Sequence, residues 1–181
     1  MKPISIIHTE PVPHKSITIP TSNTAMTLCW IGDRLVDWAG GNRVIDLERG
    51  PGGTSCSWGD FFDGAVQSPR GRYSAIVDRY HTKALLLDRG KLIRELNRSF
   101  YQAKVYEYPL AFLLGPDGQE LIAHCPNEYN RIEIDEVATG KRLTDHPGRK
   151  PEDCFHARLR PSPDNRRLLS AGWVWHPAGV A

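Results

Sequence analysis

Short apolar runs of four to six residues, bounded by Gly, Pro, Asp or Asn, recur along the chain. Runs of this length are typical of β-strands and too short for helices. Three of them follow tight turns whose prolines stand at positions 69, 116 and 163, so both intervals are 47 residues. Proline presets the backbone at the second turn position, and the Gly or Asn two residues later tolerates a left-handed backbone. The pattern predicts a repeating unit of strands and turns.

Each unit contains further apolar segments around its turn. First strands are expected at 64–67, 109–114 and 157–160, third strands at 82–88 and 130–135, and fourth strands at 92–96 and 142–144. A more degenerate copy has segments at 25–30, 35–37 and 43–47. Four-stranded antiparallel units with a period of about 40–50 residues are typical of β-propeller blades.

Two stretches resemble WD40-like repeats. Ser162-Pro163-Asp164-Asn165 resembles the turn between the first and second strands of such repeats, and the stretch 136–143 resembles the turn between their third and fourth strands. The likeness covers residues 25–181 and extends to uncharacterised bacterial proteins with this repeat. It implies an all-β protein of WD40-like blades.

The chain also departs from the WD40 pattern. No Gly-His pair opens a blade, and no Trp-Asp pair ends a third strand. Asp46, Asp88 and Asp135 stand at predicted third-strand ends, but after Ile or Leu. The His-Asp network typical of WD40 blades is therefore expected to be missing or partial.

The count of units is about three and a half, because one copy is degenerate, two are complete and the last ends near Trp175. Closed propellers typically have four to eight blades, so we expect an incomplete or open propeller over residues 25–181. Residues 1–24 are expected to form an extension that supplies a strand to a neighbouring blade. A fragment of a longer propeller is favoured, and a homo-oligomer through open blade edges is the alternative.

Composition excludes several other classes. Gly 16 and Pro 14 rule out a helix bundle, and 23 Lys+Arg interleaved with 21 Asp+Glu argue against a nucleic-acid surface. No apolar run is long enough for a signal peptide or a membrane span. The spacing of the four cysteines matches neither a disulfide framework nor a zinc-binding motif, so we expect reduced thiols in a cytoplasmic protein.

Catalytic chemistry finds little support in the sequence. Zinc prefers imidazole and thiolate ligands, which the chain offers at His124, Cys125, Cys154 and His156. His124 and Cys125 are adjacent on a predicted strand, however, so their side chains point to opposite faces and only one of them could readily join the other two. We therefore expect packed residues and no metal. The sequence contains no Gly-x-Ser-x-Gly nucleophile elbow. The Gly-rich stretch 50–55 is not a phosphate loop, because it lacks the Lys-Ser/Thr ending. The prediction is a cofactor-free protein without catalytic residues, with a metal-dependent, lactonase-like propeller enzyme as the alternative.

Aromatic side chains give a candidate binding surface. In a propeller, the loops that follow the second strands of successive blades lie on one rim. Residues of those loops are the predicted binding residues: Trp38, Arg79, Tyr80, His81, Glu128, Tyr129, Asn130 and Trp175, with Tyr106 and Tyr108 nearby. Aromatic and Arg side chains are enriched in protein-binding hot spots, so a protein partner is expected. The alternative is that these rings cover the ends of the blade cores; an immunity-type partner protein is a further function class.

Overall fold

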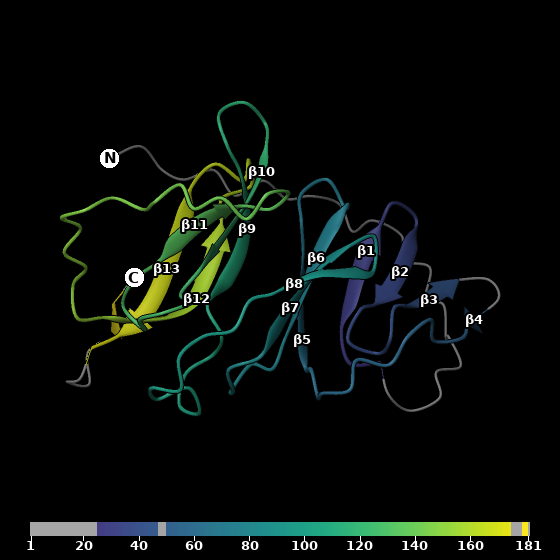
Figure 1. Cartoon of the computed structure of the whole chain (residues 1–181). Helices are drawn as coiled ribbons and strands as arrows, with labels where there is room; N and C mark the ends of the chain where they lie inside the picture. The colour runs from purple at the N-terminus through teal and green to yellow at the C-terminus, as the bar shows by residue number, and fades with distance from the viewer. Residues whose placement is uncertain (1–24, 47–49, 175–178, 181) are drawn as a thin grey trace, which may run out of the picture.

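The computed structural model describes residues 25–46, 50–174 and 179–180. These residues form an all-β protein of four small antiparallel sheets (Figure 1). The first sheet contains β1 (Leu28–Ile31), β2 (Arg34–Asp37), β3 (Arg43–Asp46) and β4 (Gly50–Pro51), and the second contains β5 (Gly64–Gln67), β6 (Tyr73–Val77), β7 (Ala84–Asp88) and β8 (Lys91–Glu95). The third contains β9 (Leu110–Leu114), β10 (Glu120–His124) and β11 (Glu133–Glu136), and the fourth contains β12 (Phe155–Pro161), β13 (Leu168–Trp173) and β14 (Gly179–Val180).

The repeated turns form as the sequence predicts. Each joins the first strand of a sheet to its second, and the residue expected to be left-handed has a positive φ: 72° at Gly71, 75° at Gly118 and 57° at Asn165. Ser68 also stabilises its turn, because its hydroxyl accepts the backbone N–H of Tyr73 at 3.0 Å. The 47-residue repeat is therefore confirmed as one sheet per unit.

Apolar layers between successive sheets form the core. Ile76 and Leu85 face the first sheet, whereas Ala75 and Leu86 face Phe112 of the third sheet. A third layer joins the third and fourth sheets: Ala111, Leu113, Leu121, Ala123 and Leu159. Alternation along the strands explains this arrangement, because residues i and i+2 share one face of a sheet. β6 and β7 are buried on both faces, as the blades of a propeller are.

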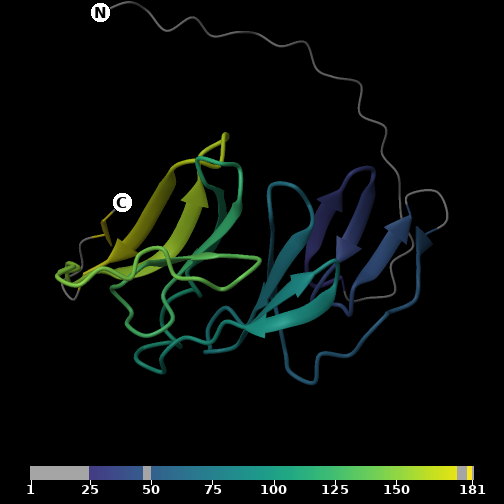
Figure 2. The ribbon, with the colours of Figure 1, turned by 45° about the horizontal axis from the view of Figure 1, so that its top comes forward.

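The four sheets follow one another in an arc (Figure 2). Their first strands are spatial neighbours, β1 beside β5, β5 beside β9 and β9 beside β12. Figures 1 and 2 both place the first and fourth sheets at opposite ends of the array. The described residues thus form an open propeller of about three and a half blades, as expected. They contain no helix, and therefore none that is long and apolar enough to cross a membrane.

Two strand predictions need correction. The expected fourth strand at 142–144 is reduced to one bridge between Arg142 and Asp135, because the Thr144 hydroxyl rather than a ladder carbonyl accepts the Ile134 N–H. The last unit does not end after its second strand, since β14 pairs with β13. Trp175 and the extension 1–24 lie outside the described residues.

The His-Asp network is partial. In the third sheet, buried His124 places Nε2 3.0 Å from Oδ2 of Asp135, and Arg142 donates to the other carboxylate oxygen at 3.1 Å. Burial opposes ionisation of Asp135, but these bonds hold the pKa of its carboxyl below the ordinary value. In the second sheet, Asp88 is instead paired with the exposed Arg72. The absence of a Gly-His pair therefore did not exclude a His-Asp contact, because His124 comes from the second strand.

Candidate functional site

Loops from the second and third sheets gather at one end of the array. The connection 96–109 between β8 and β9 contacts the loop 78–83, because Arg98 donates to the carbonyls of Arg79 and His81. The same connection contacts the loop 125–132, where the Tyr101 and Tyr129 ring centroids lie 5.1 Å apart. We call this end, comprising residues 78–83, 96–109 and 125–132, the loop rim.

Most of the predicted binding residues in the loop rim are accessible. Arg79, Tyr80, His81 and Glu128 are exposed, with Tyr80 at 44% of its full accessible surface, and Tyr129 and Asn130 are half-buried. The fold brings them to one end of the second and third sheets, with the connection 96–109 between the two groups. Their role in binding stays a prediction.

Trp38 does not belong to this surface. Its side chain is only 4% exposed, and its indole N–H donates to Gln67 Oε1 at 3.1 Å. The neighbouring Asn42 donates to the Gly90 carbonyl at 2.7 Å. Gln67 and Gly90 belong to the end of the second sheet opposite the loop rim. Trp38 therefore covers the core between the first two sheets, and its assignment to the rim is wrong.

Arg98 organises the loop rim from inside. Its side chain is 5% exposed, and its guanidinium lies within 3.3 Å of five backbone carbonyls, those of Arg79, His81, Ala103, Tyr106 and Glu107. It also lies 4.4 and 4.9 Å from the ring centroids of Tyr106 and Tyr108. Burial lowers the pKa of Arg98, and burial raises the pKa of both tyrosines. Tyr106 and Tyr108 are both buried, contrary to the expectation that they are surface residues.

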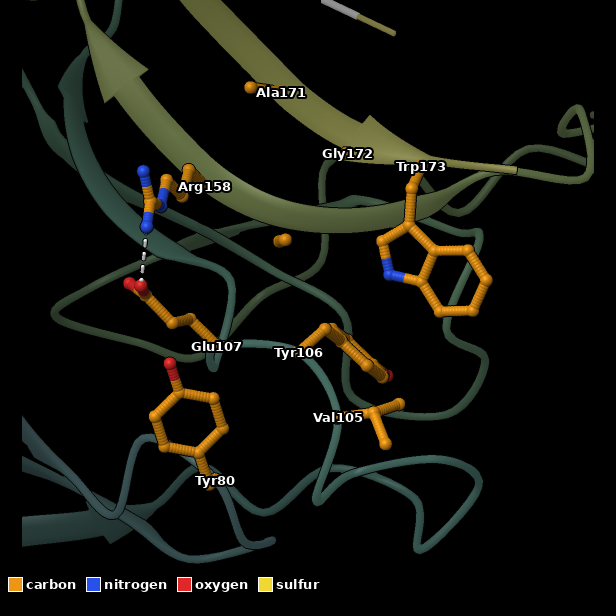
Figure 3. A pocket seen from close by; sticks show the side chains of 9 residues that line it. Tyr80, Val105, Tyr106, Glu107, Arg158, Ala171, Gly172 and Trp173 are labelled. Carbon is orange, nitrogen blue, oxygen red and sulfur yellow. Dashed lines mark hydrogen bonds and ion pairs between the residues drawn. The ribbon is translucent and has the colours of Figure 1, made fainter. Parts of the chain in front are cut away.

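A groove opens where the loop rim meets the fourth sheet. It has a volume of about 330 Å³, and the lining comes from Tyr80, the segment Val105–Glu107 and residues of β12 and β13 that include Arg158 and Trp173. Figure 3 shows Glu107 and Arg158 facing each other, with Tyr80 to one side and Tyr106, Val105 and Trp173 to the other. The Arg158 Nη2 atom lies 2.9 Å from Glu107 Oε1. The groove therefore combines aromatic lining residues with one ion pair.

The groove continues toward the first strands of the sheets. A second hollow of about 240 Å³ shares Glu107, Ala157 and Arg158 with the first and extends along β5 and β12. Arg79 and Arg160 line this extension. We call the two hollows together the inner groove. Arg79 and Tyr80 were among the predicted binding residues, whereas Arg158, Arg160 and Trp173 were not. These three residues lie on strands, and the prediction considered only the loops that follow second strands.

Stacked aromatic rings support one wall of the inner groove. Phe155 is fully buried, with its ring centroid 4.2 Å from those of both Trp173 and Tyr129, at interplanar angles of 4° and 20°. The Tyr129 hydroxyl donates to the Asp153 carboxylate, and this hydrogen bond raises the pKa of Tyr129 to about 12. Tyr129 is therefore held against Phe155 and partly covers the core, as the alternative interpretation of the rim aromatics expected.

The two histidines considered as zinc ligands contact other side chains. His124 contacts Asp135, and Nδ1 of His156 lies 2.6 Å from the Ser170 hydroxyl. Among the described residues, no group of three or more His, Cys, Asp or Glu side chains has the arrangement of a metal site. Cys125 is 2% exposed, and burial raises its pKa to about 12.

Cysteine alkylation tests this picture of Cys125. At pH 8 its thiolate fraction is about one in ten thousand, against roughly a quarter for an ordinary thiol. With iodoacetamide and peptide mass spectrometry, we expect Cys125 to be labelled far more slowly than Cys56, which is half-buried. Equal rates in the folded protein would contradict the burial of Cys125, and equal rates in urea serve as the control.

Comparisons with known proteins support the fold. No protein-family model matches the chain, and no curated protein matches it in sequence. Among solved structures, the β-propeller domain of Cps50 (Swd1) from Myceliophteria thermophila matches with a TM-score of 0.51 at 13% identity, over 83% of this chain and 48% of that chain. The Swd1 domain supports a β-propeller at the level of fold alone, since the identity is low.

Two further solved structures match more weakly. A proposed 6-phosphogluconolactonase from Bacteroides uniformis has a TM-score of 0.49 at 15% identity, over 86% of this chain and 51% of that chain. Kuenenia stuttgartiensis hydrazine synthase has a TM-score of 0.44 at 16% identity, over 77% and 40%. The chain spans about half the length, or less, of these three structures.

Proposed function

We propose that the chain is a non-enzymatic, WD40-like interaction module that binds a protein partner at the inner groove. The observation that carries the proposal is the exposed aromatic and apolar wall of the groove: Tyr80 is 44% exposed and Val105 57% exposed. Tyr80 lies beside the Glu107–Arg158 ion pair, and Val105 lies on the other side of it, beyond Tyr106. An exposed tyrosine beside an arginine ion pair, with a half-buried tryptophan in the same groove, is the composition of a binding hot spot. A cytoplasmic location and the absence of a cofactor stay predictions from the sequence.

The rigidity of the groove supports this proposal. Arg98 fixes the backbone of residues 103–107 through the carbonyls of Ala103, Tyr106 and Glu107, and Phe155 holds Trp173 by stacking. A partner that binds this surface therefore loses little free energy in ordering it, which favours affinity. Tyr80 adds contact area with few rotatable bonds.

Replacing Tyr80 with Ala is expected to weaken partner binding about thirtyfold, which corresponds to the 2 kcal/mol typical of a hot-spot truncation. Peptides selected from a display library on the wild-type protein would be titrated calorimetrically against both proteins. Because Tyr80 is exposed, the melting temperature should stay nearly unchanged. Phe61→Ala is the matched control, since Phe61 is 64% exposed and does not line the inner groove. Equal losses in the two variants, or a much lower melting temperature for Tyr80→Ala, would refute the proposal.

The enzymatic alternative makes a different prediction. A metal-dependent, lactonase-like propeller would purify with about one equivalent of zinc or calcium, whereas the interaction module is expected to contain none. Elemental analysis of the purified protein separates the two functions, and stoichiometric metal would favour the enzyme.

A further inference from the structure

A second groove lies between the first and second sheets, at the end opposite the loop rim. It has a volume of about 600 Å³, within the range of ligand-binding pockets. Its apolar lining includes Ile31, Val36 and Val44 from the first sheet. Val44 is 39% exposed although it stands on a strand, so part of this apolar surface is open to solvent.

Four arginines surround the apolar lining: Arg34, Arg70, Arg72 and Arg89. All four are exposed. Arg72 is neutralised by Asp88 at 2.7 Å, but the other three form no ion pair with a carboxylate among the described residues. Glu120 is also near, and its carboxylate accepts the backbone N–H of Arg70 at 3.1 Å. Arginine therefore exceeds carboxylate around this groove, which we call the arginine groove.

The positive charges are distributed along the groove. Arg34 belongs to β2 of the first sheet, and Arg89 stands in the turn between β7 and β8. The Arg70 guanidinium reaches toward the third sheet, where a Cβ added to Gly118 would lie 2.7 Å from its Nη2 atom. The arginine charges that remain for the groove, without an ion pair among the described residues, are therefore those of Arg34 and Arg89. Because they come from two different sheets, they suit carboxylates spaced along an extended chain better than one compact anion. The apolar lining between them suits an aliphatic side chain.

We propose that the arginine groove binds an acidic segment of a partner protein, in which Asp or Glu residues flank an aliphatic side chain. The guanidinium groups bind the carboxylates through charge-assisted hydrogen bonds, and the aliphatic side chain packs against Val36 and Val44. The groove shares no lining residue with the inner groove, so the two sites are independent.

Fluorescence polarisation with a labelled hexapeptide of sequence EDLLDE tests the proposal. We expect the wild-type protein to bind this peptide and the double variant Arg34→Glu/Arg89→Glu to bind it at least tenfold more weakly. Both substituted positions are exposed, so the melting temperature of the variant should match that of the wild type. Arg166→Glu/Arg167→Glu is the matched control, because it also reverses two exposed charges, at a turn outside the groove, and it should change the dissociation constant less than twofold. Higher salt should weaken wild-type binding, since surface charges are screened.

Two further peptides and a phosphate competition distinguish the alternatives. The charge-reversed peptide KRLLRK should not bind, and the peptide EDSSDE, which lacks the aliphatic residues, should bind several-fold more weakly than EDLLDE. Equal binding of EDSSDE would show a purely electrostatic surface and overturn the proposal. Displacement of EDLLDE by millimolar inorganic phosphate would identify a small-anion site and overturn it as well. Because Tyr80→Ala leaves the arginine groove unaltered, failure here and failure at the inner groove are separable.

Discussion

Replacing Arg98 with Met is expected to lower the free energy of unfolding by about 3–5 kcal/mol, as the loss of a buried charged hydrogen-bond network does. Met fills part of the volume but donates no hydrogen bond, so five backbone carbonyls lose the guanidinium that now binds them. Each buried acceptor left without a donor costs about 1–3 kcal/mol, although several can turn toward water. Urea denaturation measures the change.

Two variants of arginine control this experiment. Arg98→Lys keeps the charge but replaces the planar fork with a single ammonium group, so an intermediate loss of about 2 kcal/mol is expected. Arg166→Met changes an exposed residue and should stay within about 0.5 kcal/mol of the wild type. A loss below about 1 kcal/mol for Arg98→Met would contradict the interpretation of Arg98 as the organiser of the loop rim.

The contacts of Arg98 with five backbone carbonyls could not be predicted from the sequence. Arg98 stands in the polar run Asn97-Arg98-Ser99 between two predicted strands, and such a run usually belongs to a solvated connection. Only the folded chain brings the carbonyls of Arg79 and His81 to the same point as those of residues 103–107. No local pattern reports such a convergence, because the five acceptors are backbone atoms of any residue type.

The blades, in contrast, were predictable because their signals are local. Proline with Gly or Asn at a fixed offset determines each turn, and the apolar runs that follow have the length of a strand. The prediction of a strand at 142–144 was wrong where side chains replaced the ladder, since Thr144 and Arg149 both contact Glu133. Tertiary contacts of this kind override a weak strand pattern.

The rim aromatics were only partly predictable for a related reason. Equivalent loops share a rim only if successive sheets pack in the same way, and the loop 38–42 contacts Gly90 at the opposite end of the second sheet. Trp38 is therefore a core residue, whereas Tyr80 is exposed. The sequence identified the residue types of the site, and packing decided which of them reach the surface.

Replacing Phe155 with Ala should also destabilise the protein by about 3–5 kcal/mol, the usual cost of truncating a buried aromatic residue. The Phe155 side chain is fully buried, and its ring contacts those of Trp173, Tyr129 and Tyr106. Its removal leaves a cavity under the wall of the inner groove. Phe100→Ala is the control, since Phe100 is 88% exposed and should change stability by less than about 0.5 kcal/mol.

Phe155→Leu separates the structural role of this ring from its effect on the inner groove. Leu fills most of the volume, so we expect a smaller loss of about 1–2 kcal/mol and a protein that remains folded. Leu cannot stack on Trp173, however, and the indole now held parallel to Phe155 at 4.2 Å becomes free to reorient. A peptide selected on the inner groove should therefore bind Phe155→Leu more weakly, while EDLLDE binding at the arginine groove stays unchanged. Equal weakening at both grooves would indicate a global loss of structure instead of a displaced Trp173.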